Sequence, residues 1–401
     1  MVVSYAFGFY MAWNIGANDV ANSMASAVGA KAITARQAVF IASILIIVGA
    51  TLIGSHVTDT IRKGIVSTEV LNNPRLALIG AMSALLSAAL WVSFATWKSL
   101  PVSTTHSIVG AMIGFGIMAG GFQAIQWGKL TAVVMSWIIS PLFSLIISFL
   151  LFKVIVRSIL SRTDTFRAAL RLSPFFIGIA CFVVVLSFLF KTPLGKRLAI
   201  GDPMAVAAAL IIAAAVGLTG KWLIARFMIG KNNPDGEDIF RRIQIGTSCY
   251  MALALGANDV ANAIGPLTAI YFLVKTGTLG EQVPVPMFLL FFGGIGIAIG
   301  VWVAGARVMA TVGTKITTLT NTRGFSVDFA AATTVLIASK FGLPVSTTHA
   351  AVGGVMGVGL ARGIEAVNFR IVLQIALFWV LTVPAAAITS MLIYQFLTLI
   401  L

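Results

Sequence analysis

The chain has 401 residues, of which 59% are hydrophobic and only 10% are charged, and its mean hydropathy is +1.01. A soluble domain carries about 25% charged residues, so this composition excludes an ordinary soluble protein. Apolar runs of roughly 20 residues, the length that spans a bilayer, recur from one end of the chain to the other. The sequence therefore predicts an all-α, polytopic membrane protein.

The formal net charge of +15 would suggest a nucleic-acid partner in a soluble protein. In a membrane protein it fits Lys and Arg in short loops, which fix the orientation of the chain, and it also attracts anions to the entrances. We therefore expect no nucleic-acid partner. Cys181 and Cys249 lie in or beside apolar runs without metal-ligand spacing, and are expected to be packing residues.

Twelve apolar segments are expected. The first part of the chain holds five, at 2–28, 36–62, 76–97, 101–119 and 130–156. Two further segments at 174–190 and 203–224 have almost no polar interior and are interpreted as a linker pair. Five more follow, to residue 401. Only Lys98-Ser99-Leu100 separates the third and fourth segments, which predicts a tight helical hairpin, and Gly342 stands at the joint of a second hairpin.

Two polar motifs occur twice, in the same order. The run Gly16–Asn22 is identical to Gly256–Asn262, and Leu100–His106 is identical to Leu343–His349. The sequence thus predicts two repeats, at 1–157 and 243–401, joined by linker helices and basic loops at 158–242. Equivalent segments are seven crossings apart, or five if the hairpins are re-entrant. Both numbers are odd, so the repeats are expected to have inverted topology, as in many secondary transporters.

The first motif places an acid between two amides inside an apolar segment. In a helix the two Asn residues are four apart and share a face, with the Asp beside them. The alternative is a helix–helix contact through amides. Because buried ionisable groups usually mark a transport pathway, we expect a cation site of hard oxygen ligands: Asn18, Asp19, Asn22, Asn258, Asp259 and Asn262. Gly16 and Gly256 are expected to let these segments unwind locally and free backbone carbonyls.

The second motif is typical of an oxyanion site. Pro101 and Pro344 suit the first position of a helix, where the following N–H groups are unpaired at the positive end of the dipole. One Ser or Thr is enough for a helix cap, whereas here three hydroxyls are consecutive. Inverted symmetry would direct both helix starts at one point near the midplane. The predicted anion ligands are Ser103, Thr104, Thr105, Ser346, Thr347 and Thr348.

Four further polar residues accompany these motifs. His106 and His349 either carry a proton or pack as neutral side chains behind a helix turn, and we leave them outside the site. Lys98 and Lys340 precede the hairpin turns, where they would either meet the entering anion or hold the tip at an interface. No role is assigned to either pair.

Charge balance suggests symport. The motifs place two carboxylates beside an anion and contain no Lys or Arg to neutralise them. Cations bound by the Asp and Asn side chains would offset this repulsion, so anion binding should require cation binding. A partly loaded carrier would then bear uncompensated charge and reorient less readily.

At these motifs the sequence resembles the inorganic phosphate transporter (PiT) family of cation–phosphate symporters. The resemblance covers essentially the whole chain and implies phosphate as substrate, with sodium or protons as the driving ion and the motif residues above as its binding site. The large hydrophilic central loop of many eukaryotic members is absent, and segments 174–190 and 203–224 stand in its place.

The sodium-coupled importer is our main hypothesis, because several Asn oxygens around each Asp suit sodium better than a proton relay. The alternatives are proton-coupled phosphate transport and sulfate transport. We expect no enzymatic activity, since Thr105 and His106 are adjacent and do not face each other on a helix. We further expect no cofactor beyond the coupling ions, a multi-pass location in the cell membrane with both termini outside, and leave homo-oligomerisation open.

Overall fold

The structure is a computed structural model that describes residues 1–400 apart from 56, 59–64, 72, 99, 192–200, 229–232, 277–284 and 316. The described residues are almost entirely helical, and seven of their helices are long and apolar enough to cross a bilayer. These are α2 (Ala35–Ile53), α5 (Pro74–Trp97), α7 (Trp127–Ile155), α8 (Thr165–Lys191), α10 (Asp202–Phe227), α12 (Met287–Lys315) and α15 (Phe369–Ile400). The all-α, polytopic prediction is confirmed.

The polar motifs lie on other helices. The first motif of each half is on α1 (Val2–Gly29) and α11 (Gly236–Thr276), and the second motif precedes or opens α6 (Thr104–Gly120) and α14 (Thr347–Arg362). The other α-helices of the described residues are α13 (Asn321–Lys340) and the short α4 (Thr68–Leu71). The five segments expected in each half are therefore present, as α1, α2, α5, α6 and α7, and as α11 to α15, while residues 59–62 of the second expected segment lie outside the described residues.

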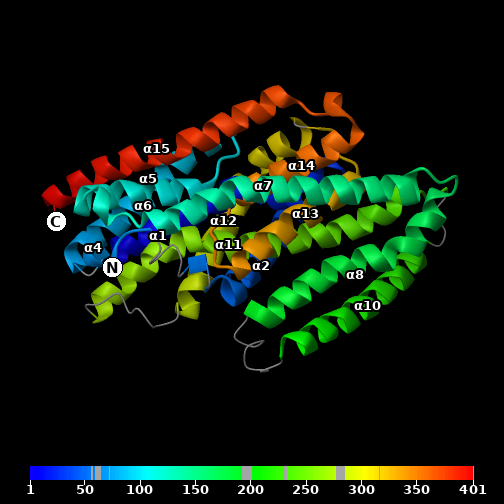
Figure 1. Cartoon of the computed structure of the whole chain (residues 1–401), viewed down its shortest axis with the longest axis horizontal. Coiled ribbons are helices and arrows are strands. Elements are labelled where there is room, and N and C mark those ends of the chain that lie inside the picture. Colours follow the sequence, from blue (N-terminus) through cyan, green and yellow to red (C-terminus); the bar gives the residue numbers. More distant parts are fainter. Residues whose placement is uncertain are drawn as a thin grey trace.

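The long helices run roughly along the longest axis of the molecule (Figure 1). Both chain termini lie at one end, and the turn between α7 and α8 lies at the other (Figure 1). The hairpin of α5 and α6 lies toward the end with the termini, whereas the hairpin of α13 and α14 lies toward the opposite end (Figure 1). Gly342 makes the second hairpin turn with φ +67°, a conformation that glycine adopts without strain.

The two halves of the chain interlock. The first helix of each half packs along the second helix of the other, so that α1 contacts α12 and α11 contacts α2. The later helices also pack against the other half. Helix α6 of the first half packs against α15 of the second, and α14 of the second half packs against α7 of the first. Every one of these contacts joins the two halves, so the described helices surround one shared centre. The division at residues 157 and 243 stays a prediction.

The expected unwinding at the motif glycines is wrong. Both α1 and α11 continue as α-helix through Gly16 and Gly256. A Cβ at Gly16 would overlap the carbonyl oxygen of Ile297 on α12, and one at Gly256 would overlap that of Ile46 on α2. These glycines therefore allow close approach of the two halves, the usual role of small residues between membrane helices.

The linker pair is longer than expected. The prediction that its first helix begins at Pro174 is wrong, because α8 begins at Thr165 and contains Pro174. The carboxylate of Asp164 accepts a hydrogen bond of 2.8 Å from the backbone N–H of Arg167, which fixes the start of the helix two turns earlier. Arg167 and Arg171 consequently belong to α8, and α8 packs against α10.

Candidate functional site

The two motif carboxylates are fully buried near the middle of the bundle. Asp19 on α1 and Asp259 on α11 are each 0% exposed. Each accepts a hydrogen bond from a threonine of the second motif in its own half: Thr104 donates to Asp19 Oδ2 at 2.6 Å, and Thr347 donates to Asp259 Oδ2 at 2.9 Å. The helix starts of α6 and α14 are thereby attached to the carboxylates of α1 and α11.

Two asparagines connect the halves. The amide of Asn22 donates to the hydroxyls of Thr347 and Thr348, at 3.2 and 2.9 Å. The amide of Asn262 donates to the hydroxyls of Thr104 and Thr105, both at 3.2 Å. Each half thus supplies amide donors to the hydroxyls of the other half, through two equivalent sets of bonds.

The hairpin tips also touch. Thr105 donates its hydroxyl to the carbonyl of Val345 at 3.2 Å, and Thr348 donates to the carbonyl of Val102 at 3.1 Å. Combined with the asparagine bonds, the hydrogen bonds of the carboxylates join nine of the twelve predicted ligands in one network: Asp19, Asn22, Thr104, Thr105, Asn258, Asp259, Asn262, Thr347 and Thr348.

The other three predicted ligands, Asn18, Ser103 and Ser346, are bonded elsewhere. All twelve are at most 5% exposed, so the structure buries the whole predicted set.

Asn18 holds the first hairpin tip. Its amide nitrogen donates to the Thr96 hydroxyl and the Leu100 carbonyl, both at 3.0 Å, and its oxygen accepts from the Val102 N–H at 3.1 Å. Asn258 differs, because its nitrogen donates to Asp259 and to the Val345 carbonyl, while its buried oxygen has no partner among the described residues. The oxygen of Asn18 thus already accepts one hydrogen bond, whereas that of Asn258 accepts none from the described residues.

The serines cap the two helix starts. Ser103 accepts from the backbone N–H of His106 at 3.1 Å, and Ser346 accepts from that of His349 at 3.2 Å. The expectation that Pro101 and Pro344 occupy the first helical position is wrong, since α6 and α14 begin three residues later, where these caps place them. Capping therefore explains the serine of each motif but not the two threonines that follow it.

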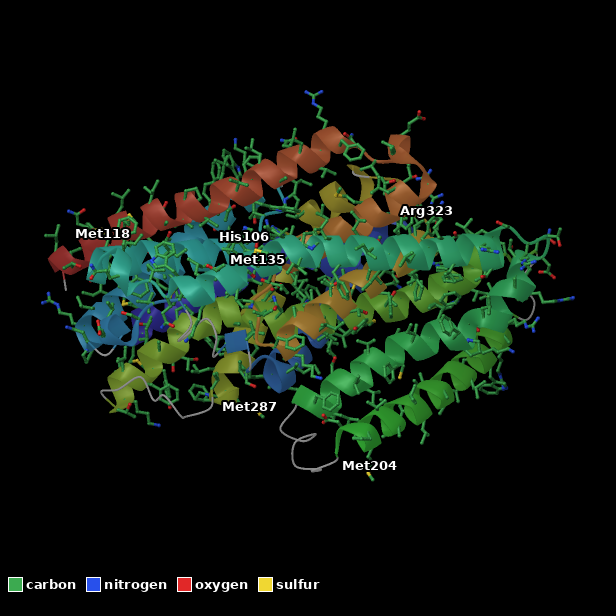
Figure 2. All side chains as sticks on the ribbon, viewed as in Figure 1. His106, Met118, Met135, Met204, Met287 and Arg323 are labelled. Atoms are coloured by element: carbon green, nitrogen blue, oxygen red, sulfur yellow. The ribbon has the colours of Figure 1, made fainter. Side chains whose placement is uncertain are left out.

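The histidines form a pair behind the threonines. The rings of His106 and His349 are 4.4 Å apart, and each stacks on a tryptophan, His106 on Trp137 and His349 on Trp379. Figure 2 places His106 near the middle of the long axis. Each Nδ1 lies within hydrogen-bond distance of the backbone carbonyl of a tryptophan, while each buried Nε2 has no partner in the part of the chain that the structure describes.

The two lysines before the hairpin turns lie on aromatic rings. Lys98 Nζ is 4.2 Å from the ring centre of Trp97, and Lys340 Nζ is 4.4 Å from that of Phe190. Neither lysine forms an ion pair with an acid in the part of the chain that the structure describes. Their contacts are those of a cation held over an aromatic face.

A third buried carboxylate was missed by the sequence reasoning. Asp328 on α13 is 1% exposed and accepts hydrogen bonds of 2.5 Å from Ser26 on α1 and from Ser248 on α11. Ser26 lies one turn beyond Asn22, so a polar line continues along α1 from the central network. The one charged residue in the stretch 325–338 was the available signal, but it is not duplicated in the first half.

Comparisons with known proteins find relatives over almost the whole length of the chain. The sequence pattern of the phosphate transporter family matches residues 15–390. A Thermococcus kodakarensis protein described as a phosphate permease is 50% identical, over 100% of this chain and 98% of its own. The chloroplast inorganic phosphate transporter 2-1 of Arabidopsis thaliana is 42% identical, over 96% of this chain and 70% of its own.

A solved structure has the same fold. It is described as the sodium-dependent phosphate transporter, is 45% identical, and superposes with a TM-score of 0.91 over 100% of this chain and 99% of that one. Together with the apolar helices, these similarities establish a multi-pass membrane protein. The chain therefore belongs to the phosphate transporter family.

Proposed function

We propose that this protein imports inorganic phosphate by symport with sodium, and that one site formed by both halves binds the ions. The observation that supports this most directly is the crossed network, in which Asn22 and Asn262 each donate to threonine hydroxyls of the other half. A ligand at these hydroxyls would contact both halves at once. The solved relative is described as sodium-dependent, which favours sodium over protons.

The residue types divide into two sets. Carboxylate and amide oxygens suit the sodium ions, and the proposed ligands are Asn18, Asp19, Asn22, Asn258, Asp259 and Asn262. Hydroxyls and the free N–H groups of two helix starts suit an oxyanion, and the proposed phosphate ligands are Ser103, Thr104, Thr105, Ser346, Thr347 and Thr348. The threonines that now donate to Asp19 and Asp259 would turn toward phosphate when sodium occupies the carboxylates.

The charge of the buried site supplies the coupling. No Lys or Arg bonds to Asp19 or Asp259 among the described residues, so a phosphate placed there would meet uncompensated negative charge. Burying unpaired charge costs several kcal/mol per ion by general estimates. Sodium binding removes this cost, and phosphate then binds only with its cations.

The hairpins provide a basis for alternating access. They approach from opposite ends of the molecule, and their tips meet through Thr105 and Thr348 (Figure 1). This agrees with inverted repeats, in which opening one tip exposes the site on one side and opening the other exposes it on the opposite side. The same plan explains why the bonds of the network occur in equivalent pairs.

Uptake by proteoliposomes tests the proposal. Labelled phosphate should accumulate inside the vesicles when an inward sodium gradient is imposed, and excess unlabelled sulfate should not compete. Accumulation driven by a pH gradient without sodium would replace sodium by protons as the coupling ion. Competition by sulfate at equal concentration would contradict phosphate as the preferred substrate.

A further inference from the structure

The linker helices leave a groove on the side of the bundle. The helix α8 packs against both α10 and α11, whereas α10 and α11 make few contacts with each other. A cavity of about 460 Å³ lies between the three helices. Its wall is almost entirely apolar, and includes Cys181 and Val184 of α8, Val216 of α10, and Gly246 and Tyr250 of α11.

One end of the groove carries a positive charge. Arg242 is part of the lining, and its guanidinium lies 5.8 Å from the ring centre of Phe227, which also lines the groove from α10. Within the described residues Arg242 has no acidic partner. An anion at this end would therefore meet a cation that is not already neutralised.

The length of the groove fits one leaflet of a bilayer. Arg242 and Tyr250 are eight residues apart on α11, which corresponds to about 12 Å along a helix. Half of the hydrocarbon core of a bilayer is about 15 Å thick. The groove thus leads from a charged end to an apolar interior over the depth that a lipid chain occupies.

We propose that this groove binds an anionic phospholipid, with an acyl chain between α10 and α11 and the phosphate headgroup at Arg242. The outer side of α10 is exposed and apolar, for example at Leu218 and Trp222, so the helix that forms one wall of the groove faces lipid. An empty cleft would forfeit the dispersion contacts of its walls. Basic pockets between membrane helices are a recurrent kind of site for anionic headgroups.

Filling the groove tests the acyl-chain site. Gly246 lines the groove, and a Cβ at this position meets no atom within 4 Å. Gly246→Leu should therefore fill the space without strain and weaken phospholipid binding at least tenfold. Native mass spectrometry of the full chain, titrated with dioleoyl phosphatidylglycerol, measures this affinity. Gly128→Leu on α7 is the matched control, because its Cβ also meets open space, and should bind like wild type.

Removing the charge tests the headgroup site. Phosphatidylglycerol should bind wild type about fivefold more tightly than phosphatidylcholine, the factor for ~1 kcal/mol per basic residue. Arg242→Gln should abolish this preference, while the exposed control Arg370→Gln keeps it. Equal affinity of wild type for both lipids, or unchanged binding by Gly246→Leu, would overturn the proposal. A wild-type dimer that Gly246→Leu dissociates would overturn it too, because a second copy would then occupy the groove.

Discussion

At the scale of single residues, the central network explains why acids and amides occupy apolar helices. Asp19 and Asp259 each accept a threonine hydroxyl, and Asn22 and Asn262 each reach across to the other half. Most polar groups of this network have a partner, because an unpaired buried group costs about 1–3 kcal/mol. Changes at these positions should therefore affect stability as well as transport, so an informative substitution keeps the size of the side chain.

Asp19→Asn keeps the size of the side chain and removes its charge. Under the proposed coupling it should lower phosphate uptake at least tenfold at low sodium and weaken the sodium dependence. Asp259→Asn should do the same, since its contacts are equivalent. Uptake is measured in proteoliposomes over a range of sodium concentrations. Asp202→Asn, an exposed position at the start of α10, is the control, and an unaltered sodium dependence of Asp19→Asn would contradict the coupling.

Asp328→Asn should destabilise the protein. Ser26 and Ser248 donate to the two carboxylate oxygens of Asp328, whereas an asparagine offers one oxygen and a competing N–H donor. The loss expected for one disrupted buried bond is about 1–3 kcal/mol. It should appear as a lower thermal unfolding midpoint in a fixed detergent, with Ser248→Ala showing a smaller decrease. A variant that unfolds at the wild-type midpoint would show that these bonds contribute nothing.

At the scale of elements, close helix packing joins the halves. Gly300 on α12 faces α1 so closely that a Cβ would overlap the carbonyl oxygen of Trp13, and Gly16 on α1 makes the reciprocal approach to Ile297. The contact is thus built from a glycine on each helix against the backbone of the other. A larger residue must separate α1 from α12.

Gly300→Leu should therefore reduce stability by more than the 1–3 kcal/mol or so typical of overpacking, because backbone atoms oppose it. We expect a lower unfolding midpoint and less monodisperse protein by size-exclusion chromatography. Gly128→Leu makes the same substitution in open space and should leave both unchanged. Equal behaviour of the two variants would exclude close packing as the role of Gly300.

At the scale of the whole molecule, basic residues gather at one end of the long axis. The turn between α7 and α8, with Arg162 and Arg167 beside it, lies opposite the two termini (Figure 1). The positive-inside rule predicts that this turn faces the cytoplasm and that both termini lie outside.

Cysteine labelling measures this orientation. In a Cys181→Ser, Cys249→Ser background, Val2→Cys should react with a membrane-impermeant maleimide on intact cells, because Val2 is 85% exposed and lies at the end that is predicted to face outside. Thr163→Cys, exposed in the α7–α8 turn, should react only after the membrane is permeabilised. The reverse pattern would invert the proposed orientation.

Sequence reasoning succeeded where the signal was hydropathy or repetition. The length of apolar runs predicted the membrane helices, and the duplicated motifs led to nine side chains that the fold brings into one network. It failed where the meaning of a residue depends on a neighbour from another helix. Asp328 has no duplicate to draw attention to it, and Gly16 and Gly256 were assigned to unwinding although they permit packing.

The sequence by itself determined the membrane class, the helices and the two kinds of polar motif, because burial in lipid requires apolar helical segments and makes every polar exception conspicuous. The tertiary structure alone decided which half supplies a partner to which hydroxyl. Asn22 meets Thr348 across more than three hundred residues, and such contacts depend on how helices pack. The local sequence pattern contains no information about that packing. The hydrogen-bond network between the two halves and the groove beside α8 could therefore be recognised only in the folded structure.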